Sequence, residues 1–428
     1  MEMIWAAKFV RLVWAKEDIL KAPFIAGKGL FLTFAIILLV AGFASSMVFA
    51  KDSNSDSGDI VSLGKAIFFD TNLSKPVGQS CASCHDPDAG FADPRNNLPV
   101  SEGAIRSRFG NRNAPSAAYA MFSPELYYDP TMRPGIMEGM YVGGLFWDGR
   151  ANTLEDQAKG PFLNPLEMHN PDKKTVVLAV RQSDYASLFK KVFGEKSLDN
   201  LDSAHPDNIN AAYQDIAQAI AAYERSTEVN PFTSKFDFWK KGEATFTESE
   251  MRGYMLFTNT TMMGAKCANC HSVSSDEYQS PSLFTNFGYQ NIGTPRNPEL
   301  PYYSLPEPLN PDGANYIDRG LGDFLRSAVY PEEQAANEDG KLRIPSLRNC
   351  AVTAPYEHNG VFKTLREVVM FNNTRDVPGA NWPAPEVPQN VHRHMPPMPR
   401  TFGQLGLTDQ QVDDIVAFLQ TLTDGFKP

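Results

Sequence analysis

The 428-residue chain is long enough for two domains with a sizeable core. Its composition, 42% hydrophobic and 21% charged, is ordinary for a globular protein. The formal net charge of −11 argues against nucleic-acid binding and is compatible with a basic redox partner.

The first 50 residues have the pattern of a membrane-targeting segment. Residues 30–50 form a nearly continuous apolar stretch without charge, long enough to span a bilayer. Residues 1–29 carry more basic than acidic side chains, so we expect them to stay in the cytoplasm and the rest to lie on the periplasmic side of a bacterial inner membrane. The small residues before position 51 also suit signal cleavage, so a transmembrane anchor and a signal segment both stay open. Polar residues 51–58 are predicted to form a flexible linker.

Helical periodicity then appears in two pairs of segments. Apolar residues recur at helical spacing over 59–69 and 209–225. The same spacing recurs after Thr247 and over Asp409 to Leu422, where Thr247 and Thr408 are predicted N-caps. Each half of the chain therefore begins and closes with an amphipathic helix.

Two Pro- and Gly-rich stretches, 281–315 and 376–403, are predicted to be loops. We place a domain boundary near residue 240, which gives an N-terminal domain over 59–240 and a C-terminal domain over 241–428. The predicted fold class is mostly α with little strand.

Four of the five cysteines lie in two Cys-x-x-Cys-His motifs, the attachment signature of a c-type haem. Two thiols add to the haem vinyl groups, and the adjacent imidazole binds the iron. A zinc site usually draws its four ligands from closely spaced pairs, and a redox Cys-x-x-Cys has no need of the following His. Two covalently bound haem c groups are therefore predicted, on Cys81, Cys84, His85, Cys267, Cys270 and His271. The fifth cysteine, Cys350, is predicted to be a small buried apolar residue.

At this point the chain resembles the bacterial dihaem cytochrome c peroxidases and the related MauG-type enzymes, over about residues 59 to 424. The most specific stretch is Phe146-Trp147-Asp148-Gly149-Arg150-Ala151, which continues through 157–161 to 164–168. Further matches cover 112–115, 345–349 and 353–360. The resemblance implies two tandem cytochrome c-like haem domains with long irregular loops.

The resemblance also implies unequal haems. The iron bound by His85 would react with peroxide, and the iron bound by His271 would take electrons from a small cytochrome c or a cupredoxin. Trp147 matches the family's relay tryptophan between the haems, although an aromatic core anchor is the plainer interpretation. Gln157 and Glu167 match the pair above the reactive iron, where a carboxylate can accept and return a proton and an amide can hold water or peroxide.

The family's calcium site between the haems matches Asn113 with the backbone carbonyls of Thr353 and Pro355. Oxygen ligands from both halves suit a hard cation. The alternative is an Asn that supports a turn.

Many family members carry a histidine in the loop after the first motif, which caps the reactive iron at rest. None of the seven histidines here lies between His85 and Trp147. We therefore expect the first haem iron to be five-coordinate or water-ligated at rest, without reductive activation. Met132, Met137 and Met140 in an inserted stretch, 123–143, could replace that histidine, although loop methionines more often pack.

The family's spacing places the sixth ligand of the second haem at Asn372, a poor ligand for iron. Met370 is near, yet two positions away on a helix turns it to roughly the opposite side. Residues of the following loop are alternatives, namely His392, His394, Met395 and Met398.

The resemblance thus predicts a peroxidase that reduces hydrogen peroxide to water. A MauG-like oxidase that modifies Trp or Tyr of a partner protein is one alternative. A non-catalytic dihaem electron carrier is another, although it would have no use for Gln157 and Glu167. The physiological donor and the dimeric state, including a homodimer, stay open.

Overall fold

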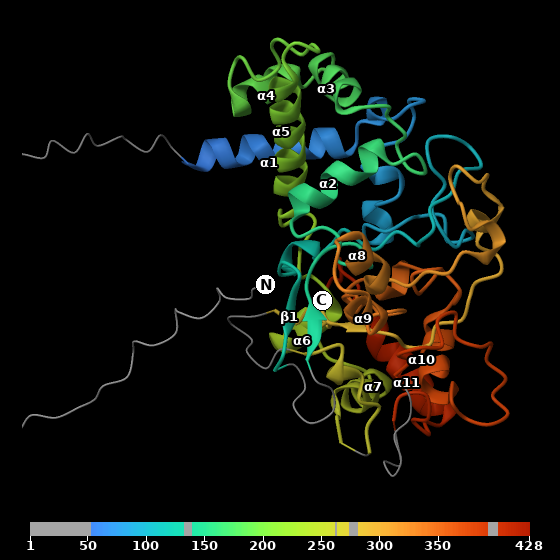
Figure 1. Ribbon diagram of the computed structural model, residues 1–428. Helices are drawn as coiled ribbons and strands as arrows, with labels where there is room; N and C mark the ends of the chain where they lie inside the picture. The colour runs from blue at the N-terminus through green and yellow to red at the C-terminus, as the bar shows by residue number, and fades with distance from the viewer. Residues whose placement is uncertain (1–52, 132–138, 262, 274–280, 393–400) are drawn as a thin grey trace, which may run out of the picture. The chain divides into compact units, whose positions relative to one another are not determined.

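The computed structural model describes residues 53–131, 139–261, 263–273, 281–392 and 401–428 (Figure 1). The predicted cytoplasmic segment 1–29 and the anchor or signal segment 30–50 lie outside the described residues. Within the described ranges, no helix is both long and apolar enough to cross a membrane.

The first half is built on helices that surround one hydrophobic cluster. They are α1 (Ser53–Phe68), α2 (Leu154–Leu163), α3 (Lys173–Arg181), α4 (Ala186–Phe193) and α5 (Pro206–Glu224). Leu63, Ile67 and Phe68 of α1 pack against Ile216 and Ile220 of α5 in this cluster. The helical periodicity of 59–69 and 209–225 is thereby confirmed as a packed pair.

The start of α1 corrects the predicted linker. Residues 53–58, expected to be a flexible tether, are helical and continue into the packed turns after Asp59. Once a helix is nucleated, each added residue costs little, so the packed turns can extend the helix into a polar stretch.

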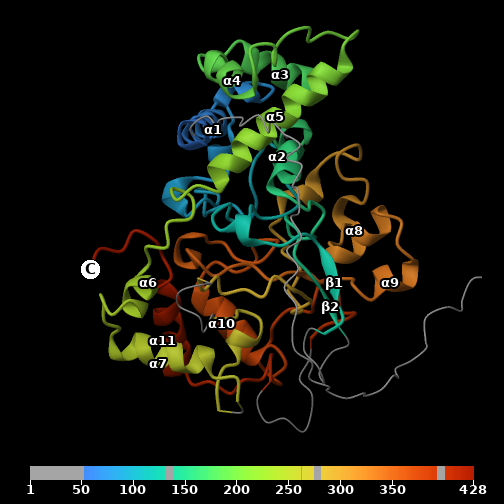
Figure 2. The same cartoon turned by 90° about the vertical axis from the view of Figure 1, so that its left-hand side faces the viewer.

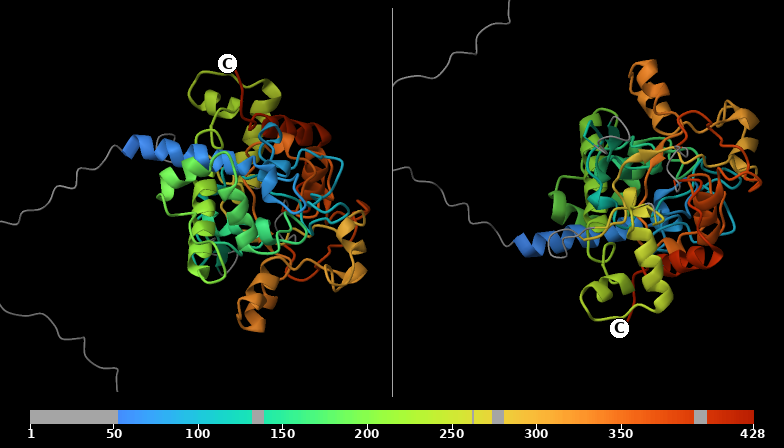
Figure 3. Two further views of the ribbon diagram at one scale, coloured as in Figure 1. Left: turned by 90° about the horizontal axis from the view of Figure 1, so that it is seen from above. Right: turned by 90° about the horizontal axis from the view of Figure 1, so that it is seen from below.

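Glycine permits the close crossing of α1 and α5, which both views of Figure 3 show. A Cβ atom on Gly64 would overlap the backbone carbonyl of Ala219. Only a residue without a side chain allows the two helix backbones to approach so closely.

The second half repeats this arrangement. Its helices are α6 (Lys235–Lys240), α7 (Glu248–Thr258), α8 (Leu321–Ser327), α9 (Glu332–Ala336), α10 (Leu365–Thr374) and α11 (Asp409–Gln420). Helices α7 and α11 lie side by side although they are far apart in the chain (Figures 1 and 2). A Cβ on Gly253 would overlap the carbonyl of Asp414, just as at Gly64. Thr247 and Thr408 both cap their helices in capping boxes, as predicted.

Strand is scarce in the described residues. Antiparallel β1 (Tyr127–Asp129) and β2 (Met140–Val142) pair within the inserted stretch, and β3 (Tyr289–Gln290) pairs with β4 (Leu342–Arg343). A bridge between Val142 and Gly288 joins the two ladders. Short 3-10 helices fill much of the rest: η1 (Thr71–Leu73), η2 (Cys81–Ser83), η3 (Pro87–Ala89), η4 (Ala120–Phe122), η5 (Cys267–Asn269), η6 (Pro301–Ser304), η7 (Gly313–Asn315) and η8 (Cys350–Val352).

A second hydrophobic cluster occupies the second half and includes Phe257, Ile415 and Phe418. The chain is therefore mostly helical, with one cluster around each crossed helix pair. This confirms the predicted fold class.

Candidate functional site: two haem-attachment sites

Both Cys-x-x-Cys-His motifs have the same local geometry. Each starts on a 3-10 helix, and each histidine N–H donates to the first cysteine's carbonyl at 2.9 Å. The Nδ1 atom of His85 lies 3.2 Å from the Phe91 carbonyl, and Nδ1 of His271 lies 2.9 Å from the Phe284 carbonyl. A carbonyl at Nδ1 holds the proton there and leaves Nε2 to bind a metal. None of the five cysteines, all of which lie in the described residues, forms a disulfide, so the four motif cysteines are available to attach haem.

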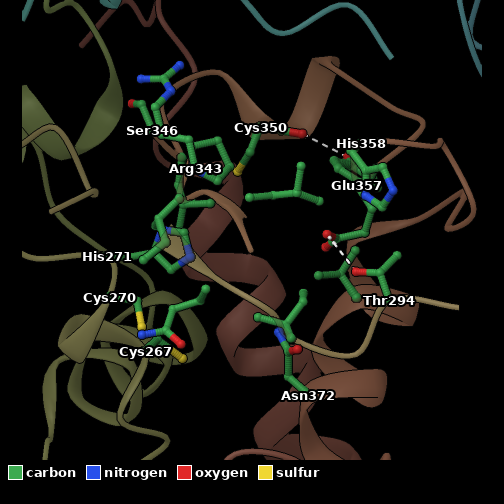
Figure 4. A pocket seen from close by; sticks show the side chains of 18 of the residues that line it. Cys267, Cys270, His271, Thr294, Arg343, Ser346, Cys350, Glu357, His358 and Asn372 are labelled. Atoms are coloured by element: carbon green, nitrogen blue, oxygen red, sulfur yellow. Dashed lines mark hydrogen bonds between the residues drawn. The ribbon is translucent and has the colours of Figure 1, made fainter. Parts of the chain in front are cut away.

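The second motif opens onto a cavity of about 440 Å³, in the range of cofactor sites. Figure 4 shows Cys267 and Cys270 on one side, with Thr294, Glu357 and His358 across the cavity. Between them lie apolar walls that include Leu365, Val369 and Leu405. Thiols and an imidazole at one edge and polar groups at the other fit a haem, which has vinyl groups on one edge and carboxylates on the other.

The polar edge contains buried groups without a protein partner. Neither ring nitrogen of His358 has a hydrogen-bond partner, and its Nε2 lies 3.6 Å from Glu386 Oε2. Burial raises the pKa of Glu357, against the opposing effects of His358 and of a hydrogen bond from Thr294. Such groups would meet the carboxylate edge of a haem in this cavity.

The candidate sixth ligands divide between the cavity and the core. Asn372 lines the cavity with His271, and its buried Oδ1 has no partner (Figure 4). Met370 packs against the second hydrophobic cluster and is not among the lining residues, as expected for a position on the other side of α10. His392 also lines the cavity. His394, Met395 and Met398 lie outside the described residues.

Glu167 lies near the first motif. Asn164 Nδ2 donates to its Oε1 at 2.7 Å, and Ala104 N–H donates to its backbone carbonyl at 2.7 Å. Burial raises the pKa of Glu167, against the opposing effects of Arg150 and Asn164. Burial is the main cause that raises the pKa of both Cys81 and Cys84, and the charge of Glu167 adds a smaller effect, as expected for a carboxyl near the haem-attachment loop. Gln157 is half-buried on α2, whose N-cap is Thr153.

The segment 113–115 reaches both attachment sites, and Trp147 is hydrogen-bonded to this segment. Trp147 Nε1 donates to the Asn113 carbonyl at 2.8 Å. Both residues line the cavity at the second Cys-x-x-Cys-His motif, which we call the second cavity. Pro115 lines the same cavity, while its backbone lies against the ring of His85. One short segment therefore contacts both sites.

Comparisons with known proteins agree with this geometry. The family described as di-haem cytochrome c peroxidase matches residues 59–245, and the family described as cytochrome c matches 250–423. The chain is 37% identical over 404 residues to "Methylamine utilization protein MauG" of Paracoccus denitrificans, covering 91% of this chain and 93% of that protein. The chain belongs to the di-haem cytochrome c peroxidase and MauG family.

Other members are similar along most of their length. "Cytochrome c551 peroxidase" of Nitrosomonas europaea is 28% identical over 410 residues, covering 92% of this chain and 91% of that protein. The crystal structure of the diheme peroxidase BthA from Burkholderia thailandensis has a TM-score of 0.72 at 35% identity, covering 86% of each chain. As a member of this family, the chain is an oxidoreductase of the cytochrome c peroxidase type with two covalently bound haem c groups.

The residues that match the family's calcium site all lie at the second cavity. Asn113, Thr353 and Pro355 line one cavity, and Asn113 N–H donates to the His358 carbonyl at 2.6 Å. The described part of the chain holds no cluster of three or more His, Cys, Asp or Glu side chains arranged for a metal. The predicted calcium ligands are amide and carbonyl oxygens, which are a different class of ligand from these four side chains.

The inserted stretch, which follows the loop where other family members carry a histidine, places one of its methionines in a packing role. Met140 is a buried residue of β2, and its Sδ packs against Gly288. Met132 and Met137 lie outside the described residues. Cys350 is buried in the second hydrophobic cluster, as predicted.

Two polar arrangements of this chain were not predicted from its sequence. Arg112 donates to both carboxylate oxygens of Asp318, at 2.6 and 2.7 Å, and to Asp148 at 2.6 Å. Tyr119 Oη donates to Asp424 Oδ2 at 2.7 Å. Arg112 lies in a stretch matched to the family, but nothing in the sequence indicated its partners.

Proposed function

We propose that the chain reduces hydrogen peroxide to water at the His85 haem, with electrons that arrive through the His271 haem from a small cytochrome c or a cupredoxin. The observation that carries the proposal is Glu167, a carboxyl with a raised pKa beside the first haem-attachment loop. An acid–base group suited to proton transfer belongs where peroxide reacts.

Peroxide cleavage needs a proton moved from one peroxide oxygen to the other, so that water can leave. Glu167 accepts and returns that proton, while Asn164 fixes its Oε1 and thereby its orientation. The neutral amide of Gln157 holds peroxide or water without competing for the proton. The haem, when bound, supplies the electrons for this reduction.

Trp147 is the proposed relay between the haems, because it lines the second cavity and is fixed by its bond to Asn113. A role of its ring as an aromatic core anchor is compatible with this relay. Asn113, Thr353 and Pro355 are the proposed calcium ligands, and calcium would hold oxygen atoms of both halves together.

The first haem is proposed to rest without a histidine cap, because the sequence between His85 and Trp147 contains no histidine. For the second haem, Asn372 lines the cavity, whereas Met370 packs against the core on the other side of α10. This supports Asn372, or a residue of the loop near it, as the sixth ligand. We also keep the boundary near residue 240 and a periplasmic location as proposals.

A MauG-like oxidation of a partner protein is the second candidate, supported by 37% identity to a protein named MauG. Asn372 weighs against the MauG-type chemistry, in which the resemblance associates a tyrosine ligand with stabilising two oxidised irons.

Steady-state consumption of peroxide with a reduced small cytochrome c tests the proposal. Wild type should turn over, and Glu167→Gln should lower kcat/KM for peroxide about 10²–10⁴-fold while both haems stay bound. Glu155→Gln is the matched control, since Glu155 lies on α2 and pairs with Arg225 at the surface. Peroxide turnover that is absent in wild type, or unchanged in Glu167→Gln, contradicts the proposal.

A further inference from the structure

Tyr119 has an unusual position among the aromatic residues near the haem sites. It is 2% exposed, belongs to the first hydrophobic cluster, and also lines the second cavity. Its backbone is left-handed, with φ of 63°. A bulky residue in that region is strained, and such strain persists where the surrounding structure demands it.

The phenol of Tyr119 has a defined proton acceptor. Its Oη donates to Asp424 Oδ2 at 2.7 Å, and it accepts from Phe232 N–H at 3.1 Å. Asp424 is itself fixed, because its Oδ1 accepts from Thr233 N–H at 2.9 Å. Burial, with Asp424, raises the pKa of Tyr119, so the phenol keeps its proton at neutral pH.

The ring is held rigidly. Phe232 packs edge-on against Tyr119 with centroids 4.8 Å apart, and the Arg348 guanidinium lies 4.9 Å from the Tyr119 centroid. Arg348 pairs with both oxygens of Asp237, at 2.8 and 3.0 Å, so its charge is largely balanced. A fixed ring beside a fixed carboxylate needs little rearrangement when its charge changes.

We propose that Tyr119 is a redox-active residue that stores one oxidising equivalent between the two haem sites. One electron leaves the phenol for the peroxide-derived oxidant, and the Oη proton moves to Asp424 Oδ2. The products are a neutral tyrosyl radical and a protonated Asp424. An electron from the donor protein and the same proton then restore the phenol. This inference rests on the proposed function, because hydrogen peroxide is the oxidant.

Two other tyrosines, half-buried Tyr185 and buried Tyr223, also donate to carboxylates, which gives an internal comparison. Tyr185 Oη donates to Asp70 at 2.6 Å, and Tyr223 Oη donates to Glu228 at 2.9 Å. Both pairs lie in the first half, and neither tyrosine lines the second cavity. Of these three tyrosines, which all belong to or pack against the first hydrophobic cluster, Tyr119 is the one that also lines the second cavity.

The test is rapid-freeze electron paramagnetic resonance of the holoprotein after mixing with peroxide, without donor. Protein labelled with ring-deuterated tyrosine should give a radical signal that narrows relative to unlabelled protein. The signal should be lost in Tyr119→Phe, which keeps the ring, and kept in Tyr223→Phe, which removes a comparable pair. Asp424→Asn cannot take up the proton, so its signal should fall at least about 10-fold.

Each alternative result has a defined meaning. A radical signal that is unchanged in Tyr119→Phe overturns the inference. If Tyr119→Phe fails to fold, an unchanged signal in Asp424→Asn overturns it. Wild type that turns over peroxide with a donor yet gives no deuterium-sensitive signal overturns the inference and leaves the proposed function intact. Wild type that consumes no peroxide overturns both, because the radical then has no oxidant.

Discussion

Glu167 is a half-buried carboxyl whose negative charge is only partly compensated by its neighbours, and this sets its chemistry. One oxygen accepts from Asn164, while burial makes the charged form costly. A group in this position exchanges a proton more readily near neutral pH than an exposed glutamate does. Its value to the reaction therefore depends on pH.

The raised pKa of Glu167 predicts an acid limb in the peroxide reaction. The unprotonated form must accept the first proton, so kcat/KM for peroxide should fall as the pH drops through that raised pKa. The fall should begin above the ordinary glutamate value of about 4.3. Measuring kcat/KM across this range checks it, and Glu167→Gln should lack the limb. If wild type and Glu167→Gln showed the same acid limb, Glu167 would not be the group that transfers the proton.

At the level of single residues, the sequence predicted which groups bear chemistry but few of their contacts. Cys-x-x-Cys-His requires only local spacing, so the haem-attachment residues could be found directly. The family's spacing also pointed to Asn372 as the sixth ligand, which stays a prediction; Asn372 lines the cavity, whereas Met370 packs against the second hydrophobic cluster. The pair of Tyr119 and Asp424 could not be predicted, because 305 positions separate them and only the packed fold brings them together.

Each half of the molecule depends on one close helix crossing. Gly64 allows α1 to meet α5, and Gly253 allows α7 to meet α11. The second crossing positions the 3-10 helix that carries Cys267, since α7 contacts η5 directly. In the first half, Cys81 packs against the hydrophobic cluster that α1 and α5 share. The glycines therefore support the haem sites although they carry no chemistry.

Gly64→Ala should destabilise the protein by about 3 kcal/mol or more, because the added methyl group meets backbone that cannot move aside. Gly58→Ala is the matched control on α1, since Gly58 is exposed and a Cβ there meets nothing within 4 Å. That change should stabilise the helix by about 0.5–1 kcal/mol. Urea unfolding of the holoproteins measures both. Equal effects of the two substitutions would refute the close-packing argument.

Helices α1, α5, α7 and α11 were predictable because their signals are local. Threonine caps and apolar residues at helical spacing located α7 and α11. The start of α1 at Ser53 was missed because helix extension from packed turns overrides a polar sequence. The role of Gly64 was also hidden, since it depends on the partner helix.

For the whole molecule, buried charges tie the two haem-bearing halves together. Arg112 from the first half is bidentate to Asp318 of the second and also pairs with Asp148. Burial alone would raise the pKa of Asp318, but Arg112 lowers it well below its ordinary value. The pair therefore contributes stability above the unfolded-state pKa, near 3.9, that is lost as the pH falls toward the folded value.

Arg112→Met should cost about 3–5 kcal/mol at pH 7, because it leaves the buried carboxylate of Asp318 without its guanidinium partner, whereas Asp148 still pairs with Arg150. The cost should shrink as the pH falls, since the unpaired Asp318 then takes up a proton. Urea unfolding at several pH values measures this. Arg366→Met is the control, because Arg366 pairs with exposed Asp409 and Asp413, and it should change stability little. A loss for Arg112→Met that is the same at every pH would contradict the electrostatic account.

The central claim is that the first haem site is ready to react with peroxide in the fully oxidised protein. The measurement is stopped-flow spectroscopy of the oxidised holoprotein mixed with peroxide, followed by addition of a reduced small cytochrome c. The account predicts an immediate haem absorbance change without prior reduction, and its reversal by the donor. Oxidised protein that ignores peroxide until the second haem has been reduced would contradict the account.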